Sequence, residues 1–261
     1  MQIVTIVQKK GGIGKTSLAM LIASAALARG EKVLMIDADV NSQLSRWKGA
    51  YEDSNWGSIE KPEWPENLRI QPLPEPADMT DDDLDALFET FEKESEAGTD
   101  LVIIDTRPGS YIDTAEFAAA ADVVLIPAEP QTGSFRLVHS TISWMAELEK
   151  MTEGPFPVYQ VVVSNVPTKM LSAAVTEGGL QTLPIQDQEI LHEIFATPTF
   201  DTMIPHSQII SRIFHHGPLG TAAEGYGKSR GGKLQERNLR DILEVADHLY
   251  AEVKALGYKD E

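Results

Sequence analysis

The chain has 261 residues, of which 42% are hydrophobic and 24% are charged, so it is long enough to bury a sizeable core. It contains no cysteine, which excludes disulfides, thiolate zinc sites and iron–sulfur clusters, and no apolar run reaches the roughly 18 residues of a membrane span. A net charge of −18 argues against a protein that binds nucleic acid over its whole surface, because both partners would be polyanions. We expect a soluble cytoplasmic protein.

The first part of the chain alternates apolar runs with helical segments. We expect strands over 2–7, 32–37, 68–74 and 100–105. A helix rich in Ala and Leu follows the first strand and ends at Gly30. Thr80 is expected to cap an acidic helix before the fourth strand.

The second part continues this alternation. Further strands are expected over 121–127, 158–165 and 200–205, a helix over 132–151, and a long amphipathic helix over 234–256. Residues 50–66 and 214–232 are expected to be loops. Strands that alternate with helices predict a doubly wound α/β fold, with a mostly parallel sheet flanked by helices, in one domain over 1–261.

A glycine-rich loop follows the first predicted strand, where residues 8–18 read QKKGGIGKTSL. The general phosphate-loop pattern G-x-x-x-x-G-K-[ST] fails because its first glycine falls on Lys9, whereas K-G-G-x-G-K-[ST] fits from Lys10 to Thr16. Backbone N–H groups of residues 11–16 are expected to surround phosphate oxygens at the start of the helix. Lys15 would neutralise the β- and γ-phosphates, and the Thr16 hydroxyl would ligate Mg²⁺.

Carboxylates follow two of the predicted strands. Asp37 ends the strand 32–37 and Asp39 follows it by two residues, and Asp105 ends the strand 100–105. Ligands of open α/β sheets bind at this edge, so Asp105 is expected to hold the water shell of the magnesium. The alternative, that these aspartates only cap the loops after the strands, stays open.

A basic stretch lies near the C-terminus of this acidic chain. Between residues 226 and 240 the only acidic residue is Glu236, whereas five residues are basic: Lys228, Arg230, Lys233, Arg237 and Arg240. The local charge of +4 predicts an anion-binding face for DNA. The alternative is a solvated surface.

Several of these stretches resemble the ParA/MinD family of ATPases. The run from Lys10 to Thr16 is similar to their deviant Walker A loop, VLMIDAD to their second nucleotide motif, and LVIIDTRPG to their Walker B strand. AADVVLIPAEPQTGSF and FDTMIPHSQIISRIFHHGPLG resemble stretches further along ParA proteins. Within the family, DADVNSQLSRW and RGGKLQERNLR look closest to partition proteins and to VirC-type ATPases of T-DNA transfer.

The resemblance implies a homodimer closed around ATP and Mg²⁺, in which Lys10 reaches the nucleotide of the partner copy. It implies that Asp39 orients the attacking water and that Asp37 lies near the magnesium, together with Thr16 and Asp105. The nucleotide-binding residues that it implies are Lys10, Gly11, Gly12, Ile13, Gly14, Lys15, Thr16, Ser17 and, at the adenine, Asn165 and Pro205.

The function that the resemblance implies is a nucleoid-associated partition ATPase. ATP-bound dimers would bind DNA without sequence preference, and a ParB-like adaptor would stimulate hydrolysis and release. The alternatives are a positioning ATPase for a non-DNA cargo such as a chemoreceptor cluster, a VirC-type DNA-transfer factor, a membrane-associated positioning ATPase and, further off, a metabolic synthetase. The closing helix is acidic, unlike the basic anchor of MinD, so no membrane anchor is expected.

A few further sequence features lead to predictions outside the nucleotide site. DTRPG stands where partition proteins often read DTPP, so Arg107 and Gly109 make partner-linked switching uncertain. Too few residues precede the first strand for a helix-turn-helix, so operator autoregulation is not expected. Lys9 is expected to be a solvated loop charge, His215 and His216 to bind no metal, and three tryptophans to pack rather than stack on bases: Trp47, Trp56 and Trp64.

Overall fold

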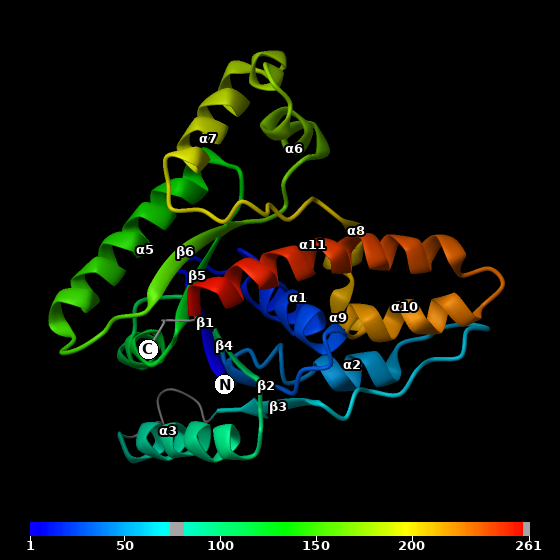
Figure 1. Ribbon diagram of the computed structural model, residues 1–261, viewed down its shortest axis with the longest axis horizontal. Helices are drawn as coiled ribbons and strands as arrows, with labels where there is room; N and C mark the ends of the chain where they lie inside the picture. Colours follow the sequence, from blue (N-terminus) through cyan, green and yellow to red (C-terminus); the bar gives the residue numbers. More distant parts are fainter. Residues whose placement is uncertain (74–80, 258–261) are drawn as a thin grey trace.

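A computed structural model describes residues 1–73 and 81–257 (Figure 1). The predicted cap at Thr80 lies outside these residues. The strands are β1 (Gln2–Ile6), β2 (Val33–Ala38), β3 (Leu68–Pro72), β4 (Leu101–Thr106), β5 (Val123–Ala128) and β6 (Val158–Val163). The helices are α1 (Lys15–Ala28), α2 (Trp47–Asp53), α3 (Asp81–Glu96), α4 (Ile112–Ala119), α5 (Thr132–Met151), α6 (Thr168–Val175), the 3₁₀ helix η1 (Gly179–Thr182), α7 (Ile185–Phe195), α8 (Gln208–Ser211), α9 (Ile213–His216), α10 (Leu219–Lys228) and α11 (Lys233–Gly257).

The strands form one sheet in the order β3-β2-β4-β1-β5-β6, and every pairing between them is parallel. Strands β2, β3 and β4 lie on one side of β1, with β4 directly beside it, and β5 and β6 lie on the other side, which confirms the doubly wound α/β fold. In such sheets ligands bind beyond the carboxyl ends of the strands, where the order reverses. The loop after β1 lies at that point, and Asp37 of β2 pairs in register with Asp105 of β4.

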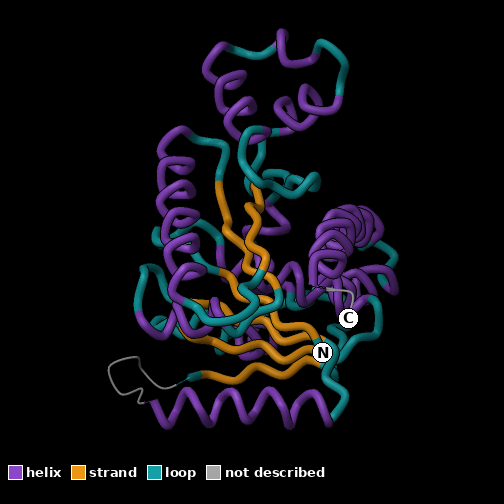
Figure 2. The backbone as a smooth tube through the Cα atoms, turned by 60° about the vertical axis from the view of Figure 1, so that its left-hand side comes forward, coloured by secondary structure: helices purple, strands orange, loops and turns teal. Residues whose placement is uncertain are grey.

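Both faces of the sheet are buried, because the strands are almost continuously apolar. Val33 and Met35 of β2 pack toward α1, α10 and α11, whereas Leu34 and Ile36 pack toward α3 and α4. Nearer to β6, that second face is covered by α5 (Figure 2). The predicted apolar face of α11 is confirmed, since Leu239, Ile242, Ala246, Leu249, Tyr250 and Val253 are buried in it.

Helices α6, η1 and α7 stand away from the sheet beyond β6 (Figures 1 and 2). The chain then returns along β6 as an irregular segment, so the predicted strand over 200–205 is wrong. This segment forms two isolated bridges with β6 and the residues after it, Val161 with Thr199 and Val166 with Pro205, and the Ile204 N–H donates to the Val163 carbonyl between them at 2.9 Å. Between the bridges, the backbone N–H groups of Asp201 and Thr202 donate to the Glu252 carboxylate of α11, which keeps them out of the ladder.

The predicted loops over 50–66 and 214–232 are partly wrong. Helix α2 extends into the first, and α9 and α10 occupy most of the second. One glycine that suggested a loop, Gly225, instead allows close packing of α10, because a Cβ there would lie 2.7 Å from Pro62 and 3.0 Å from Trp56.

The tryptophans before β3 pack, as predicted. The rings of Trp47 and Trp64 meet edge to face at 5.3 Å, and Trp56 lies 4.9 Å from Tyr226 of α10. This aromatic cluster attaches the 50–66 segment to α10. Among the described residues, no helix is long and apolar enough to cross a membrane.

Candidate functional site

The glycine-rich loop joins β1 to the first turn of α1. Gly12 and Gly14 have φ angles of 71° and 88°, a region that strains any residue with a Cβ. Gly14 is the N-cap of α1, so the unpaired N–H groups and the positive end of this helix face the loop. The loop is therefore built to receive phosphate oxygens.

The three lysines of the loop have different surroundings. Lys15 is buried, with 6% of its surface exposed, and this burial lowers its pKa, whereas the charges of Asp105 and Asp39 raise it. Lys10 is exposed and forms no hydrogen bond or ion pair with the described residues. Lys9 is half-buried, and its ammonium donates to the carbonyl and the hydroxyl of Ser140 in α5, both at 3.1 Å. Both hydrogen bonds are exposed, so Lys9 keeps contact with solvent as expected, and the attachment to α5 is added to that expectation.

Thr16 and Asp105 meet at the entrance to α1. The Thr16 hydroxyl donates to Asp105 Oδ2 at 2.6 Å, while Oδ1 is buried without a hydrogen-bond partner among the described residues. Burial raises the pKa of Asp105 to about 7, against the Thr16 hydrogen bond and the charge of Lys15, which lower it. An unpaired buried carboxylate oxygen beside a hydroxyl suits a hard cation such as Mg²⁺.

The candidate metal site has two protein oxygen ligands, from Thr16 and Asp105. Across residues 1–73 and 81–257, no group of three or more carboxylates or histidines is arranged to hold a metal ion by itself. Magnesium is commonly bound by one or two protein oxygens together with substrate phosphates. Thr16 and Asp105 are the residues that would hold it here.

Asp37 and Asp39 are held in different ways. Asp37 is buried, and its Oδ2 accepts hydrogen bonds from the backbone N–H and the hydroxyl of Ser45 at 2.6 and 2.7 Å. Asp39 is half-buried, and its Oδ1 accepts from the backbone and side-chain nitrogens of Asn41, both at 2.9 Å. Asp37 thus anchors the loop after β2, while Asp39 remains accessible near Lys15.

A cavity of about 260 Å³ opens beside the glycine loop. Its lining joins the loop to the ends of β5 and β6 and to α8: Gly12, Ile13, Gly14, Ser17, Leu18, Leu21, Glu129, Ser164, Asn165, Ile204, Pro205, His206, Ser207, Ile210 and Ser211. Both predicted adenine residues, Asn165 and Pro205, therefore lie on the wall of one cavity that also borders the phosphate loop. Asn165 has a φ angle of 61°, which asparagine tolerates better than most residues.

The loop after β4 packs on the phosphate loop. A Cβ at Gly11 would lie 3.4 Å from Pro108, and the neighbouring Arg107 donates to Asp113 at 2.8 Å. The Arg107 guanidinium carbon lies 3.6 Å from the centre of the Tyr111 ring, which also occupies the space beside Gly109. Arg107 and Gly109, the two departures from the partition pattern, therefore build one compact loop.

The basic stretch forms an exposed surface on α10, α11 and the turn between them. We call this the basic surface; its members, all exposed, are Lys228, Arg230, Lys233, Arg237 and Arg240. Lys233 and Arg240 each form an ion pair with Glu236, at 3.1 and 3.2 Å. The remaining three have no ion pair within the described part of the chain, so positive charge is left for a ligand.

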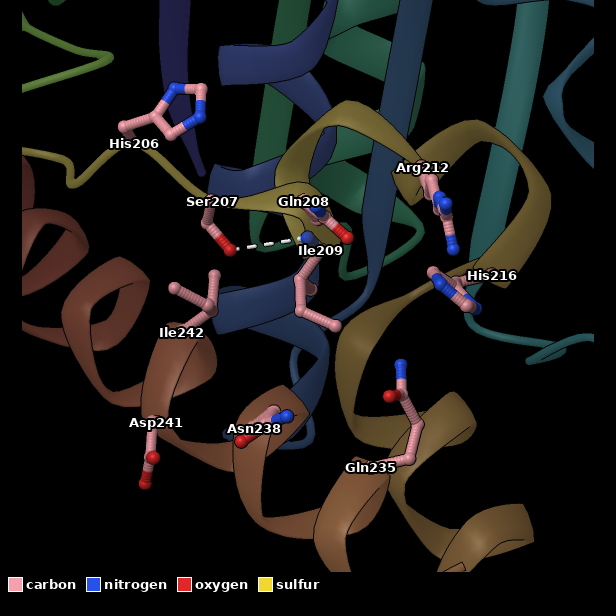
Figure 3. Close-up of a pocket in the computed structure, with 10 residues that line it drawn as sticks. All are labelled: His206, Ser207, Gln208, Ile209, Arg212, His216, Gln235, Asn238, Asp241 and Ile242. Atoms are coloured by element: carbon pink, nitrogen blue, oxygen red, sulfur yellow. Dashed lines mark hydrogen bonds between the residues drawn. The ribbon is translucent and has the colours of Figure 1, made fainter.

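A second cavity, of about 390 Å³, lies between α8, α9 and α11 (Figure 3). Arg212 and Gln235 point toward His216 across it, while the Ser207 hydroxyl accepts a 3.1 Å hydrogen bond from the backbone of Ile209. Burial, with the charge of Arg212, lowers the pKa of His216. This cavity shares His206 and Ser207 with the cavity at the glycine loop.

Three polar residues at the site were missed by the sequence analysis. Ser45 follows Asp37 by eight residues, with no motif to single it out. Glu129 and His206 flank Asn165 in space but lie far from it in sequence, at 36 and 41 residues. The one sequence feature that could have indicated Glu129 and His206 is that each directly follows an apolar run, in the sequences AEP and IPH.

Taken together, the parallel sheet, the glycine loop at its switch point and the paired Thr16 and Asp105 define a P-loop nucleoside triphosphatase. The family model described as VirC1 protein matches residues 1–256, and the chain belongs to this family.

Known proteins place this family beside ParA and MinD, which confirms the resemblance. Protein virC1 of Rhizobium radiobacter is 26% identical over 245 residues, covering 94% of each chain. The chromosome-partitioning ATPase Soj of Thermus thermophilus is 25% identical, covering 85% of this chain and 91% of its own. The MinD cell division protein of Aquifex aeolicus has a solved structure with TM-score 0.61 and 20% identity, covering 96% of this chain and 98% of that one.

Adenine nucleotide and magnesium are present in solved structures of the same fold. Cobyrinic acid a,c-diamide synthase of Mycobacterium smegmatis holds ADP and magnesium, with TM-score 0.61 and 18% identity over 97% of this chain and 96% of that one.

Proposed function

We propose that this protein is an ATPase that dimerises around ATP and Mg²⁺, binds DNA without sequence preference as the dimer, and releases it after hydrolysis stimulated by a ParB-like partner. The observation that carries the proposal is the contrast between two lysines of one loop. Lys15 is buried near carboxylates, where it would serve its own nucleotide, whereas Lys10 is exposed and has no hydrogen-bond or ion-pair partner among the described residues, as a lysine offered to a second copy would be.

The edge of the sheet around Lys10 also suits a second copy. Three large apolar side chains are exposed on the loops and the helix start after β2 and β4: Val40 at 51%, Tyr111 at 48% and Ile112 at 82%. These segments leave adjacent strands at the end where the glycine loop lies. Apolar side chains exposed around a site are typical of a surface that another protein covers.

The roles of individual residues follow from this arrangement. The loop from Gly11 to Thr16 and Ser17 would hold phosphate, and Asn165 and Pro205 would contact the adenine. Asp39, accessible and oriented by Asn41, would position the attacking water. When magnesium is bound, it would supply charge neutralisation at the phosphates, with Thr16 and Asp105 as its protein ligands and Asp37 fixing the adjacent loop.

DNA would bind at the basic surface, because its unpaired charges stand on a chain that is otherwise acidic. A single copy offers about four or five phosphate contacts, which is weak at physiological salt, and dimerisation doubles the contacts on one duplex. Membership of the VirC1 family favours a second candidate function. With the same ATP-dependent mechanism, the protein would position DNA for transfer.

The test is DNA binding by the purified protein with ATP, with ADP and without nucleotide. We expect a duplex of random sequence to be shifted at low salt with ATP and Mg²⁺ only, together with ATP hydrolysis. ATP binding without any DNA shift would overturn the DNA part and favour a protein-surface cargo. A protein that bound no ATP would overturn the proposal as a whole.

A further inference from the structure

A chain of hydrogen-bonding side chains crosses the wall of the 260 Å³ cavity. Asn165 Nδ2 donates to Glu129 Oε1 at 3.2 Å, and Asn165 Oδ1 lies 2.6 Å from His206 Nδ1. All three residues line the cavity. Glu129 has no place in the phosphate chemistry described above, which raises the question of what its carboxylate does there.

The backbone holds both ends of this contact. Glu129 donates its N–H to the hydroxyl of Ser134, which is buried at the start of α5. Ser164, just before Asn165, donates its N–H to the carbonyl of Ala128 at 2.8 Å. Glu129 and Asn165 are therefore fixed side by side across neighbouring strands β5 and β6.

The Glu129 carboxylate fixes the orientation of the Asn165 side-chain amide. An ionised carboxylate can only accept hydrogen bonds, so the side of the amide that meets Glu129 must be its NH₂ group. The opposite orientation would place two acceptor oxygens together. Oδ1 is thereby turned to the other side, where one lone pair accepts from His206 and the second lone pair is left for a ligand.

We infer that Glu129 is a specificity-determining residue for the purine base, because it fixes Asn165 with an acceptor toward position 6 of the ring. An acceptor there matches the 6-amino group of adenine, which donates, and opposes the 6-carbonyl of guanine or hypoxanthine, which accepts. The inference rests on the proposed function, since it requires that a nucleotide base occupy this cavity.

The test compares ATP with ITP, which differs in carrying a carbonyl at position 6. The affinity of the whole chain for each is measured by equilibrium titration. We expect the wild type to prefer ATP by about tenfold, the worth of roughly one hydrogen bond, and Glu129→Gln to reduce the preference to within about threefold. A glutamine is nearly isosteric but can donate, so either orientation of Asn165 becomes possible. Glu193→Gln, which removes the charge of a carboxylate bonded to His139 in another part of the molecule, is the matched control and should keep the full preference.

A double-mutant cycle separates positioning from direct contact. Asn165→Gly removes the amide and tolerates the positive φ angle. In this background Glu129→Gln should cause no further change in the ATP-to-ITP ratio, because Glu129 acts through Asn165. An unchanged ratio in Glu129→Gln alone, or a further loss in the Asn165→Gly background, would overturn the inference. Absence of binding to either nucleotide by the wild type would instead refute the proposed function.

Discussion

The Thr16 hydroxyl donates a 2.6 Å hydrogen bond to Asp105, which joins the first turn of α1 to the end of β4 across 89 positions of the sequence. The second oxygen of the same carboxylate is buried and has no partner in the described part of the chain. A buried acceptor without a partner costs about 1–3 kcal/mol, so the site is more stable when a cation or another donor occupies that position.

Asp105→Asn should therefore remove the contribution of magnesium to ATP binding while leaving ATP binding without the metal nearly unchanged. The amide oxygen can still accept from Thr16, but the charge that attracts the cation is lost. We expect Mg²⁺ to strengthen ATP binding by about tenfold in the wild type and by less than twofold in the variant, measured by titration with Mg²⁺ and with EDTA. An equal gain from Mg²⁺ in both proteins would show that Asp105 does not serve the metal.

Lys15→Ala should weaken ATP binding by about hundredfold or more, because the loop would lose the buried charge that we propose to contact phosphate oxygens. Equilibrium dialysis with labelled ATP measures this directly. Lys9→Ala is the matched control, since Lys9 lies in the same loop but bonds to Ser140 of α5, and it should bind ATP like the wild type. Similar losses in both variants would point to a general disturbance of the loop.

Lys10→Ala and Asp39→Ala should change the dimer in opposite directions. Removing the exposed Lys10 leaves the loop's own phosphate contacts in place, so ATP should bind but the ATP-dependent dimer should disappear. Asp39→Ala should bind ATP, hydrolyse it about hundredfold more slowly, and accumulate the dimer. Size-exclusion chromatography with light scattering, in ATP and Mg²⁺, distinguishes these states. A dimer that forms without nucleotide and survives Lys10→Ala would contradict the sandwich arrangement.

The parts of the site that follow one short motif were predictable from the sequence. A strand, a glycine loop and a helix place Lys15 and Thr16 by local geometry, and Asp105 follows because parallel strands end at one edge. The contact between Glu129 and Asn165 could not be predicted, because it depends on which strands are neighbours. The strand expected over 200–205 is interrupted for a similar reason, since Glu252, far along the chain, accepts from the N–H groups of Asp201 and Thr202.

Gly225→Ala should destabilise the protein by about 1–3 kcal/mol, although alanine favours helices, because its Cβ would collide with the rigid rings of Pro62 and Trp56. Urea unfolding of the two proteins, followed by the tryptophan fluorescence of the aromatic cluster, gives the difference in the free energy of unfolding. Gly220→Ala is the matched control in the same helix. Its Cβ would meet Leu243 at an ordinary 3.7 Å, so this change should be neutral or stabilising.

Arg237→Glu with Arg240→Glu should weaken DNA binding on all sequences alike and leave ATP hydrolysis without DNA close to the wild-type rate. Arg237 has no ion pair in the described part of the chain, whereas Arg240 shares Glu236 with Lys233, so the single change at Arg237 should cause most of the loss. The log–log salt dependence of binding should have a slope near −0.9 for each phosphate neutralised, and it should become shallower in the variant.

The control for that change must alter the net charge equally. Lys93→Glu with Lys150→Glu reverses two exposed lysines on α3 and α5, away from the basic surface. If DNA bound through the basic surface, this control would keep nearly the wild-type salt slope, because the number of phosphates contacted would be the same. If attraction depended only on the net charge of −18, both double variants would weaken binding to a similar extent, and the basic surface would have no special role.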